Sequence, residues 1–236
     1  MQEHKIVSKE EWLQSRKEHL AKEKEFTRMR DELSKNRREL PWVKVEQDYV
    51  FEGPTGKENL SILFGECSQL IVFHFMFGTD WKEGCPSCSF WADNVDGIDV
   101  HLNHRDIKLV AVSKAPLPSL ESYQRRMGWQ FKWVSSFENC FNHDFQVSFT
   151  PEEIEKGEVI YNYGVNKFPR EELPGFSVFY KDGNGDIFHT YSCYSRGLDM
   201  LNGAYHFMDI APKGRDEAEL DYGMAWLRRH DQYDDE

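Results

Sequence analysis

The sequence predicts an α/β domain with a central mixed β-sheet flanked by helices, preceded by a long N-terminal helix and a hairpin. Three observations predict it. Apolar and β-branched runs alternate with helical segments along most of the chain. Two of these runs flank a single helix, which is the pattern of a βαβ unit with parallel strands. A turn rich in Gly and Asp joins two further runs into an antiparallel hairpin.

The composition allows a large core and argues against two classes of partner. Of 236 residues, 39% are hydrophobic and 14% are aromatic, although the mean hydropathy is −0.70. A net charge of −12 repels a phosphate backbone, so we expect no nucleic-acid binding. The longest apolar run, 70–77, is too short to cross a bilayer, and the N-terminus shows no secretory signal. We expect a soluble cytoplasmic protein that binds no membrane.

A long helix is predicted over residues 8–39. Ser8 and Glu11 form a capping-box pattern, and neither Gly nor Pro occurs before Pro41. The apolar side chains of this segment are sparse and stand among Lys, Arg and Glu. Two interpretations stay open. The helix packs on the domain by a narrow apolar stripe, or it is a dimerisation arm that makes the protein a homo-oligomer.

The sequence divides into three predicted parts: a helical arm over 1–41, a central domain over 42–212 and an acidic C-terminal tail over 213–236. Turn residues and hydrophobic periodicity place the elements of the domain. They are a strand at 43–51, an apolar segment at 60–65, a strand at 70–77, a helix from residue 86 that breaks near 97, a strand at 107–116, a helix at 117–128, a strand at 129–136, a short helix at 150–157, a hairpin at 176–192 and a helix at 196–210.

Two cysteines, Cys85 and Cys88, stand where the loop after a buried strand leads into a helix. Pro86 between them is favoured at the first turn of that helix. Free N–H groups and the helix dipole stabilise a thiolate at such a position, so a thiol there titrates near or below neutrality. The second cysteine lies one turn further on the same helical face. We predict that Cys85 is the nucleophile and that Cys88 is a buried resolving thiol.

Other interpretations of the pair need residues that the sequence lacks or scatters. Attachment of haem needs a histidine directly after the second cysteine, where Ser89 stands. A zinc site needs two further ligands at metal-site spacing, whereas Cys67, Cys140 and Cys193 are single and distant. A pair of inert buried thiols stays an alternative. We expect no metal and no organic cofactor, because the sulfur pair itself carries the electrons.

A family resemblance is carried by four stretches: LPWVKVEQDYVFEGPTGK, QLIVFHFMFGTDWKEGCPSCSFWADN, LVAVSKAP and FHTYSCYSRGLDMLNGAYHFMDI. They resemble a bacterial domain-of-unknown-function family whose members are described as thioredoxin-like or dithiol-disulfide oxidoreductase proteins. The resemblance extends from His4 to the C-terminus. It implies the thioredoxin fold in its redoxin form, and a protein or small-molecule disulfide or thiol as substrate.

The resemblance to thioredoxin suggests two further site residues. Thioredoxins carry a cis-proline opposite the dithiol, just before the hairpin, and Pro174 resembles it in order along the chain. The alternative is an ordinary loop proline. The buried acid of thioredoxin has no obvious match, but His74 in the corresponding strand is a candidate base for the resolving thiol. The alternative is a core histidine whose hydrogen bonds are satisfied.

The motif departs from those of several redox families. Its proline placement is similar to that of glutaredoxin, not thioredoxin. Peroxiredoxins place Thr or Ser three residues before the peroxidatic cysteine and Pro seven before it, where Lys82 and Gly78 stand here. We therefore predict a thiol-disulfide oxidoreductase. Two alternatives stay open: a thioredoxin-fold binding or scaffold protein that uses its thiols little, and a thiol-dependent peroxidase of unusual motif.

Overall fold

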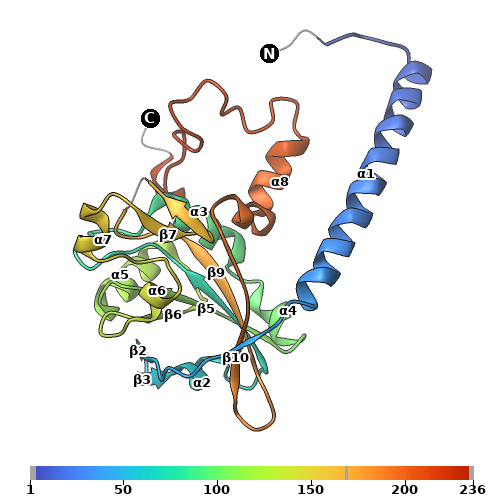
Figure 1. Cartoon of the computed structure of the whole chain (residues 1–236). Coiled ribbons are helices and arrows are strands. Elements are labelled where there is room, and N and C mark those ends of the chain that lie inside the picture. The colour runs from blue at the N-terminus through green and yellow to red at the C-terminus, as the bar shows by residue number, and fades with distance from the viewer. Residues whose placement is uncertain (1–3, 168–169, 234–236) are drawn as a thin grey trace. The chain divides into compact units, whose positions relative to one another are not determined.

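The structure is a computed structural model that describes residues 4–167 and 170–233 (Figure 1). The chain divides into two compact units, Met1–Pro41 and Trp42–Glu236. The first unit carries α1 (Lys9–Arg38), whose N-terminus is held by the predicted capping box. A packed stripe and a dimerisation arm stay predictions for this helix, and so does the separate acidic tail at the C-terminus.

The second unit carries the remaining helices and strands. They are β1 (Val43–Lys44), β2 (Val50–Gly53), β3 (Gly56–Asn59), α2 (Leu60–Leu63), β4 (Gln69–His74), α3 (Pro86–Val95), α4 (Asp99–Asn103), β5 (Ile107–Ser113), α5 (Leu117–Met127), β6 (Lys132–Ser135), α6 (Phe141–Asp144), α7 (Pro151–Glu155), β7 (Val159–Tyr161), β8 (Gly164–Asn166), β9 (Gly175–Lys181), β10 (Ile187–Tyr194), the 3-10 helix η1 (Ser195–Leu201), α8 (Gly203–Ile210) and the 3-10 helix η2 (His230–Gln232).

Within the described residues, one sheet of eight strands has the order β1-β10-β9-β4-β5-β6-β2-β3. Strands β4, β5 and β6 are parallel, whereas β9 runs antiparallel to β4 and β10 antiparallel to β9. Strand β4, helix α3 and strand β5 therefore form the predicted βαβ unit, and β9 with β10 forms the predicted hairpin. The order β5-β4-β9-β10 with these directions is that of a thioredoxin-like fold. The predicted fold class is confirmed.

Two predicted elements are each split in the structure. The strand expected at 43–51 becomes β1, which pairs with β10, and β2, which pairs with β3 and β6 near the other edge of the sheet. Period-two patterning marks an extended chain but does not say which strand it will pair with. The helix expected at 196–210 is divided into η1 and α8. The Asn202 side chain accepts a hydrogen bond from the Tyr205 N–H and so caps the start of a new helix.

Two hydrophobic clusters pack on the two faces of the sheet. Successive side chains of a strand point to opposite faces. In β4, Phe73 packs in the cluster that contains Cys88 and Trp91 of α3, whereas Leu70 and Val72 pack in the other cluster. The helix that begins at the dithiol thus covers one face of the sheet.

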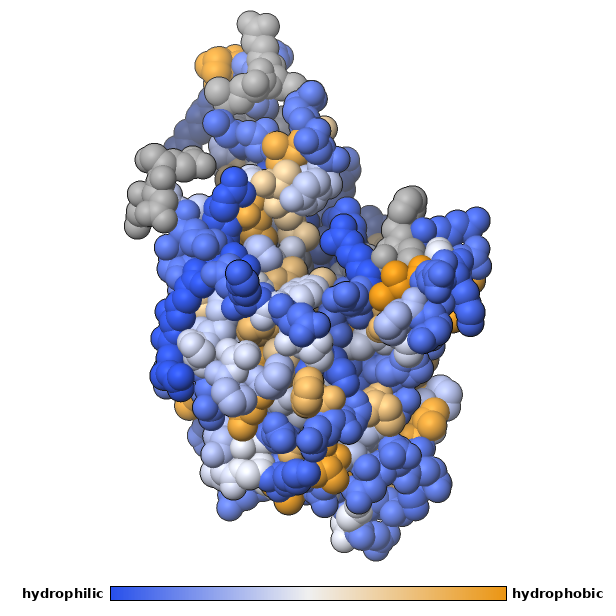
Figure 2. Space-filling model, turned by 90° about the vertical axis from the view of Figure 1, so that its left-hand side faces the viewer, coloured by the Kyte–Doolittle hydropathy of each residue, from blue (hydrophilic) through white to orange (hydrophobic). Residues whose placement is uncertain are grey.

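The surface is mainly hydrophilic on the face that Figure 2 shows, where hydrophobic side chains lie in small separate patches. Charged residues make up 30% of the chain, which agrees with this view. Among the described residues, no helix has both the length and the apolar character needed to cross a membrane.

We predict that Phe73→Ala lowers the free energy of unfolding by about 3–5 kcal/mol, because it opens a cavity in the core beneath α3. The Phe73 ring is fully buried and stacks on Phe176 with ring centroids 4.5 Å apart. Phe207→Ala is the matched control, since this ring is 74% exposed and its loss should change stability by less than about 0.5 kcal/mol. Urea denaturation measures the free energy of unfolding of both variants, and an equal loss in the two would contradict the predicted core.

Candidate active site

Cys85 is the N-cap residue of α3, and Pro86 takes the first position of the helix as predicted. Ser89, one turn later, donates both its N–H and its hydroxyl to the Cys85 carbonyl, each at 2.9 Å. The N–H groups of Ser87 and Cys88 donate to the Cys85 sulfur. The local chain therefore surrounds this sulfur with donors at the start of a helix.

The loop between β4 and α3 is tied to both cysteines through Met76. The Cys85 N–H donates to the Met76 carbonyl at 3.0 Å, and the Met76 N–H donates to the Cys88 sulfur at 3.3 Å. Gly84 completes the loop, and an added Cβ there would lie 2.6 Å from the Phe75 ring and 2.7 Å from the Tyr123 ring. Only glycine fits this position without displacing buried rings.

The two thiols have opposite electrostatic environments. A hydrogen bond from the Cys88 thiol, together with N–H donors, lowers the pKa of Cys85 from 9.0 to about 6, although burial acts in the opposite direction. Burial, and then the contact with the Cys85 sulfur, raises the pKa of Cys88 well above 9.0. Near neutral pH the half-buried Cys85 is thus a thiolate, and the buried Cys88 is a thiol that donates to it.

A buried carboxyl group stands close enough to influence the dithiol. Glu172 is 5% exposed, accepts a hydrogen bond from the Ser148 hydroxyl at 2.6 Å, and contributes to the raised pKa of Cys88. Burial raises its own pKa to about 8. Sequence reasoning missed Glu172, because it stands beside another acid in a stretch that resembles a solvated loop. Its position two residues before Pro174, itself a predicted site residue, was the one feature of the sequence that could have indicated a role at the site.

Pro174, one of the predicted site residues, lines the same cavity as Cys88. The expected cis bond is wrong, because every peptide bond of the described residues is trans. The ordinary trans preference of a bond before proline is not overridden here. The Pro174 carbonyl accepts a hydrogen bond from the Tyr161 hydroxyl at 2.7 Å, which fixes the loop before β9.

His74 lies on the other face of the sheet from the dithiol. Its ring stacks on Phe141 and Phe145, and its Nε2 is 2.8 Å from the Ser177 hydroxyl. Burial lowers the pKa of His74 to about 3. Strand alternation directs Phe73, its neighbour in β4, toward α3 and directs His74 away from it. The base role expected for His74 therefore has no geometric support. The alternative of a satisfied core histidine holds for Nε2 only, because the buried Nδ1 has no hydrogen-bond partner among the described residues.

The C-terminal segment supports the loop from outside. Arg229 donates to the Gly84 carbonyl at 2.8 Å and to the Tyr123 hydroxyl at 2.9 Å, and it pairs with Glu83. The same Tyr123 hydroxyl is 2.9 Å from the hydroxyl of Ser89. Arg229 is thus linked through one tyrosine to the residue that holds the Cys85 carbonyl. No sequence pattern indicated this contact between distant parts of the chain.

A cavity of about 820 Å³ opens beside the dithiol. Its lining includes Ser87, Cys88, Pro174, Trp91, Tyr205 and Met224. This volume lies in the range of about 300–1,000 Å³ that is typical of small-molecule sites. Within the described part of the chain, no group of three or more potential metal-ligating side chains is found.

Comparisons with known proteins give one family match. The model of the family described as "Bacterial protein of unknown function (DUF899)" matches residues 1–233. No curated protein matches the chain.

Solved structures give matches of low identity. The Mycobacterium tuberculosis peroxidoxin BcpB is 12% identical with a TM-score of 0.46, over 69% of this chain and 93% of that one. Peroxiredoxin Q of Xanthomonas campestris is 12% identical with a TM-score of 0.44, over 64% and 86% of the two chains. The yeast mitochondrial 1-Cys peroxiredoxin is 16% identical with a TM-score of 0.40, over 66% and 70%. Similarity at this level decides nothing about activity.

We predict that the alkylation rate of Cys85 by iodoacetamide rises with pH around a midpoint near 6. Cys88→Ala should move the midpoint toward 9.0, because it removes the largest influence that favours the thiolate. Cys88→Ser keeps a hydroxyl donor and should move it less. Peptide mass spectrometry measures the rate at this cysteine alone. A midpoint near 9.0 in the wild type would contradict the assignment.

Glu172 should make the protein less stable as the pH rises. Its pKa is raised from 4.5 to about 8 in the folded chain, so only the unfolded chain ionises between these values. The contribution of Glu172 to the free energy of unfolding is therefore full below pH 4.5 and is lost as the pH rises through about 8. Between these values the free energy of unfolding falls by about 1.4 kcal/mol per pH unit. Glu172→Gln, which cannot ionise, should remove this dependence. Urea unfolding across the pH range tests it, and parallel curves for both proteins would contradict it.

Proposed function

We propose that this chain, which belongs to the DUF899 family of bacterial proteins of unknown function, is a thiol-disulfide oxidoreductase that works through Cys85 and Cys88. Membership of the family confirms the resemblance carried by the four sequence stretches. One observation carries the proposed activity: the Cys88 thiol and the N–H groups of the first helical turn converge on the Cys85 sulfur, and Cys88 itself lines a cavity. A stabilised thiolate with a second thiol in contact is what exchange chemistry needs.

The first step is attack by the Cys85 thiolate on one sulfur of a substrate disulfide. The substrate S–S bond breaks, a mixed disulfide forms at Cys85, and the leaving thiolate takes up a proton. Cys88 then attacks the Cys85 sulfur, which releases the second substrate thiol and forms the Cys85–Cys88 disulfide. Two electrons have passed to the substrate. An external dithiol returns two electrons and restores both thiols.

Glu172 is our candidate for the group that takes the proton from Cys88. The buried thiol must lose this proton before it attacks, and its high pKa makes that loss unfavourable without a base. A carboxyl group with a pKa of about 8 exchanges protons near neutral pH, as general-base catalysis requires. The ionised form of Glu172 raises the pKa of Cys88, so the two groups lie close enough to interact, which supports this role.

We also propose that the protein works in the reducing cytoplasm. Cys67, Cys85, Cys88 and Cys140 are thiols that form no disulfide in the structure. Thiols of this kind are kept reduced by the glutathione and thioredoxin systems of that compartment.

We predict that Cys85→Ser lowers the rate of disulfide reduction by about a thousandfold or more, because it removes the attacking sulfur. Cys88→Ser should trap a mixed disulfide at Cys85, visible as an added mass that dithiothreitol removes. The assay follows reduction of 2-hydroxyethyl disulfide and of insulin, with dithiothreitol as the external dithiol.

The matched control is Cys140→Ser, which changes an exposed cysteine at the N-cap of α6 and should leave the rate unchanged. If the wild type reduces neither substrate, the scaffold alternative replaces the enzyme. If peroxide is consumed while both disulfides are left intact, the peroxidase alternative replaces it.

A further inference from the structure

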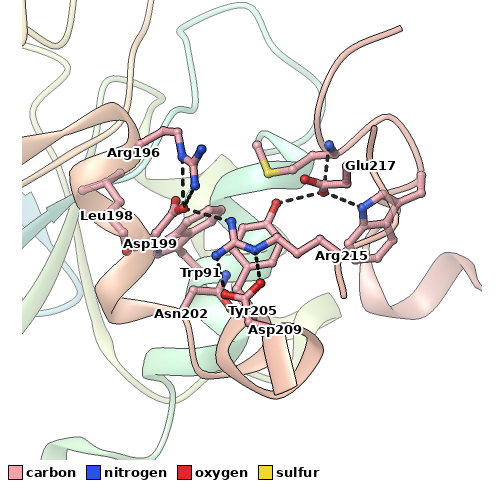
Figure 3. Close-up of polar contacts among 11 residues, drawn as sticks. Trp91, Arg196, Leu198, Asp199, Asn202, Tyr205, Asp209, Arg215 and Glu217 are labelled. Carbon is pink, nitrogen blue, oxygen red and sulfur yellow. Dashed lines mark hydrogen bonds and ion pairs between the residues drawn. The ribbon is translucent and has the colours of Figure 1, made fainter. Parts of the chain in front are cut away.

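The C-terminal segment supplies part of the cavity lining, and the carboxylate of Glu217 is one of its links to α8 (Figure 3). Glu217 Oε1 accepts three hydrogen bonds: from the Tyr205 hydroxyl at 3.2 Å, from the Met224 N–H at 3.0 Å and from the Trp226 Nε1–H at 2.8 Å. All three donors are neutral. No ion pair of the described residues involves this carboxylate.

The arginines at the cavity are already matched by carboxylates. Arg215 donates through Nε and Nη2 to Asp209 at 2.8 and 2.9 Å, and through Nη1 to Asp199 at 2.9 Å (Figure 3). Arg196 donates from the other side to the same Asp199 oxygen. The Arg215 guanidinium also lies 3.8 Å from the centre of the Tyr205 ring. These arginines act as structural links, because their charges are already paired.

Two carboxylates of the cavity lack such a match. The lining contains two arginines, four carboxylates and no lysine or histidine, which leaves a formal charge of −2. Among the ion pairs of the described residues, none provides a cation for Asp216 or Glu217. The Oε2 atom of Glu217 takes no part in the three hydrogen bonds and lies on the side of Gly223, another lining residue.

We infer that the cavity binds a small disulfide that carries an ammonium group, with the ammonium at Asp216 and Glu217 and the disulfide at Cys88, whose thiol is hydrogen-bonded to the Cys85 sulfur. This inference rests on the proposed function. Phe73, Trp91, Leu198 and Met224 supply apolar walls suited to the methylene groups between nitrogen and sulfur. An ammonium donating to the two unmatched carboxylates forms charge-assisted hydrogen bonds that a neutral or acidic disulfide cannot form.

The bound disulfide would react as the proposed function describes. The Cys85 thiolate displaces one aminothiol as its thiolate, which then binds a proton. Cys88 displaces the second aminothiol from the mixed disulfide. Two aminothiols and one Cys85–Cys88 disulfide result, and an external dithiol reduces the enzyme again.

Three disulfides with equal two-carbon spacers test the inference: cystamine, which is cationic, 2-hydroxyethyl disulfide, which is neutral, and 3,3′-dithiodipropionate, which is anionic. Each kcat/KM is divided by the rate constant for direct reduction by dithiothreitol, which corrects for intrinsic reactivity. We expect cystamine to exceed the neutral compound by about tenfold, and the anionic compound to be the poorest. The preference should weaken as salt rises from about 0.05 to about 0.5 M.

The variants Asp216→Asn and Glu217→Gln should together lower the cystamine preference about tenfold. Glutamine keeps a carbonyl oxygen for the three donors that bind Glu217, so the segment stays fastened. Glu219→Gln is the matched control, because this exposed neighbour does not line the cavity, and it should leave the preference unchanged. Circular dichroism and urea unfolding check that each variant is folded.

The outcomes separate the inference from the function it rests on. Reduction of all three disulfides without preference for cystamine, or a preference that survives in the double variant, overturns the inference and leaves the oxidoreductase. Faster reduction of insulin than of cystamine, compared as corrected kcat/KM, also overturns it, because the substrate is then a protein. Inactivity toward every disulfide overturns both.

Discussion

The hydrogen bonds between Met76 and the two cysteines are the constraint on which the candidate site depends. They hold the start of the loop after β4 against the start of α3, where Cys85 is the N-cap residue next to the Cys88 thiol. Gly84 makes the loop narrow enough to pass between Phe75 and Tyr123. The free N–H groups of the first helical turn then face sulfur and not water.

This arrangement stabilises a thiolate without a nearby cation. Burial disfavours the charged sulfur. Hydrogen bonds must therefore supply the whole of the stabilisation, and the largest part comes from the Cys88 thiol. The resolving thiol thus has two functions: it activates Cys85 while protonated and attacks it once deprotonated. An acidic cavity beside such a sulfur suits a cationic ligand, whose charge would further stabilise the thiolate.

The sequence predicted what local patterns encode. Alternating runs gave the βαβ unit and hairpin, and Cys-Pro at a helix start placed the nucleophile, because both depend on neighbours in the chain. Residues 43–51 read as one strand in the sequence, because nothing local shows that the two halves pair with different strands. The position of His74 in β4 suggested a role at the dithiol. Its side chain points to the opposite face of the sheet, where it contacts Phe141. Glu172, Glu217 and Arg229 could not be assigned, since their roles arise from contacts between distant segments.

The most direct test of the central claim is equilibration of the protein in glutathione redox buffers, with the thiols trapped by acid and mapped by mass spectrometry. We expect a single disulfide between Cys85 and Cys88 that forms and breaks reversibly. Its fraction should follow a two-electron curve, with about 30 mV for each tenfold change in the equilibrium ratio. Cys85 and Cys88 are not a redox pair if both stay thiols across the full range of buffers, or if the disulfide that forms joins other cysteines.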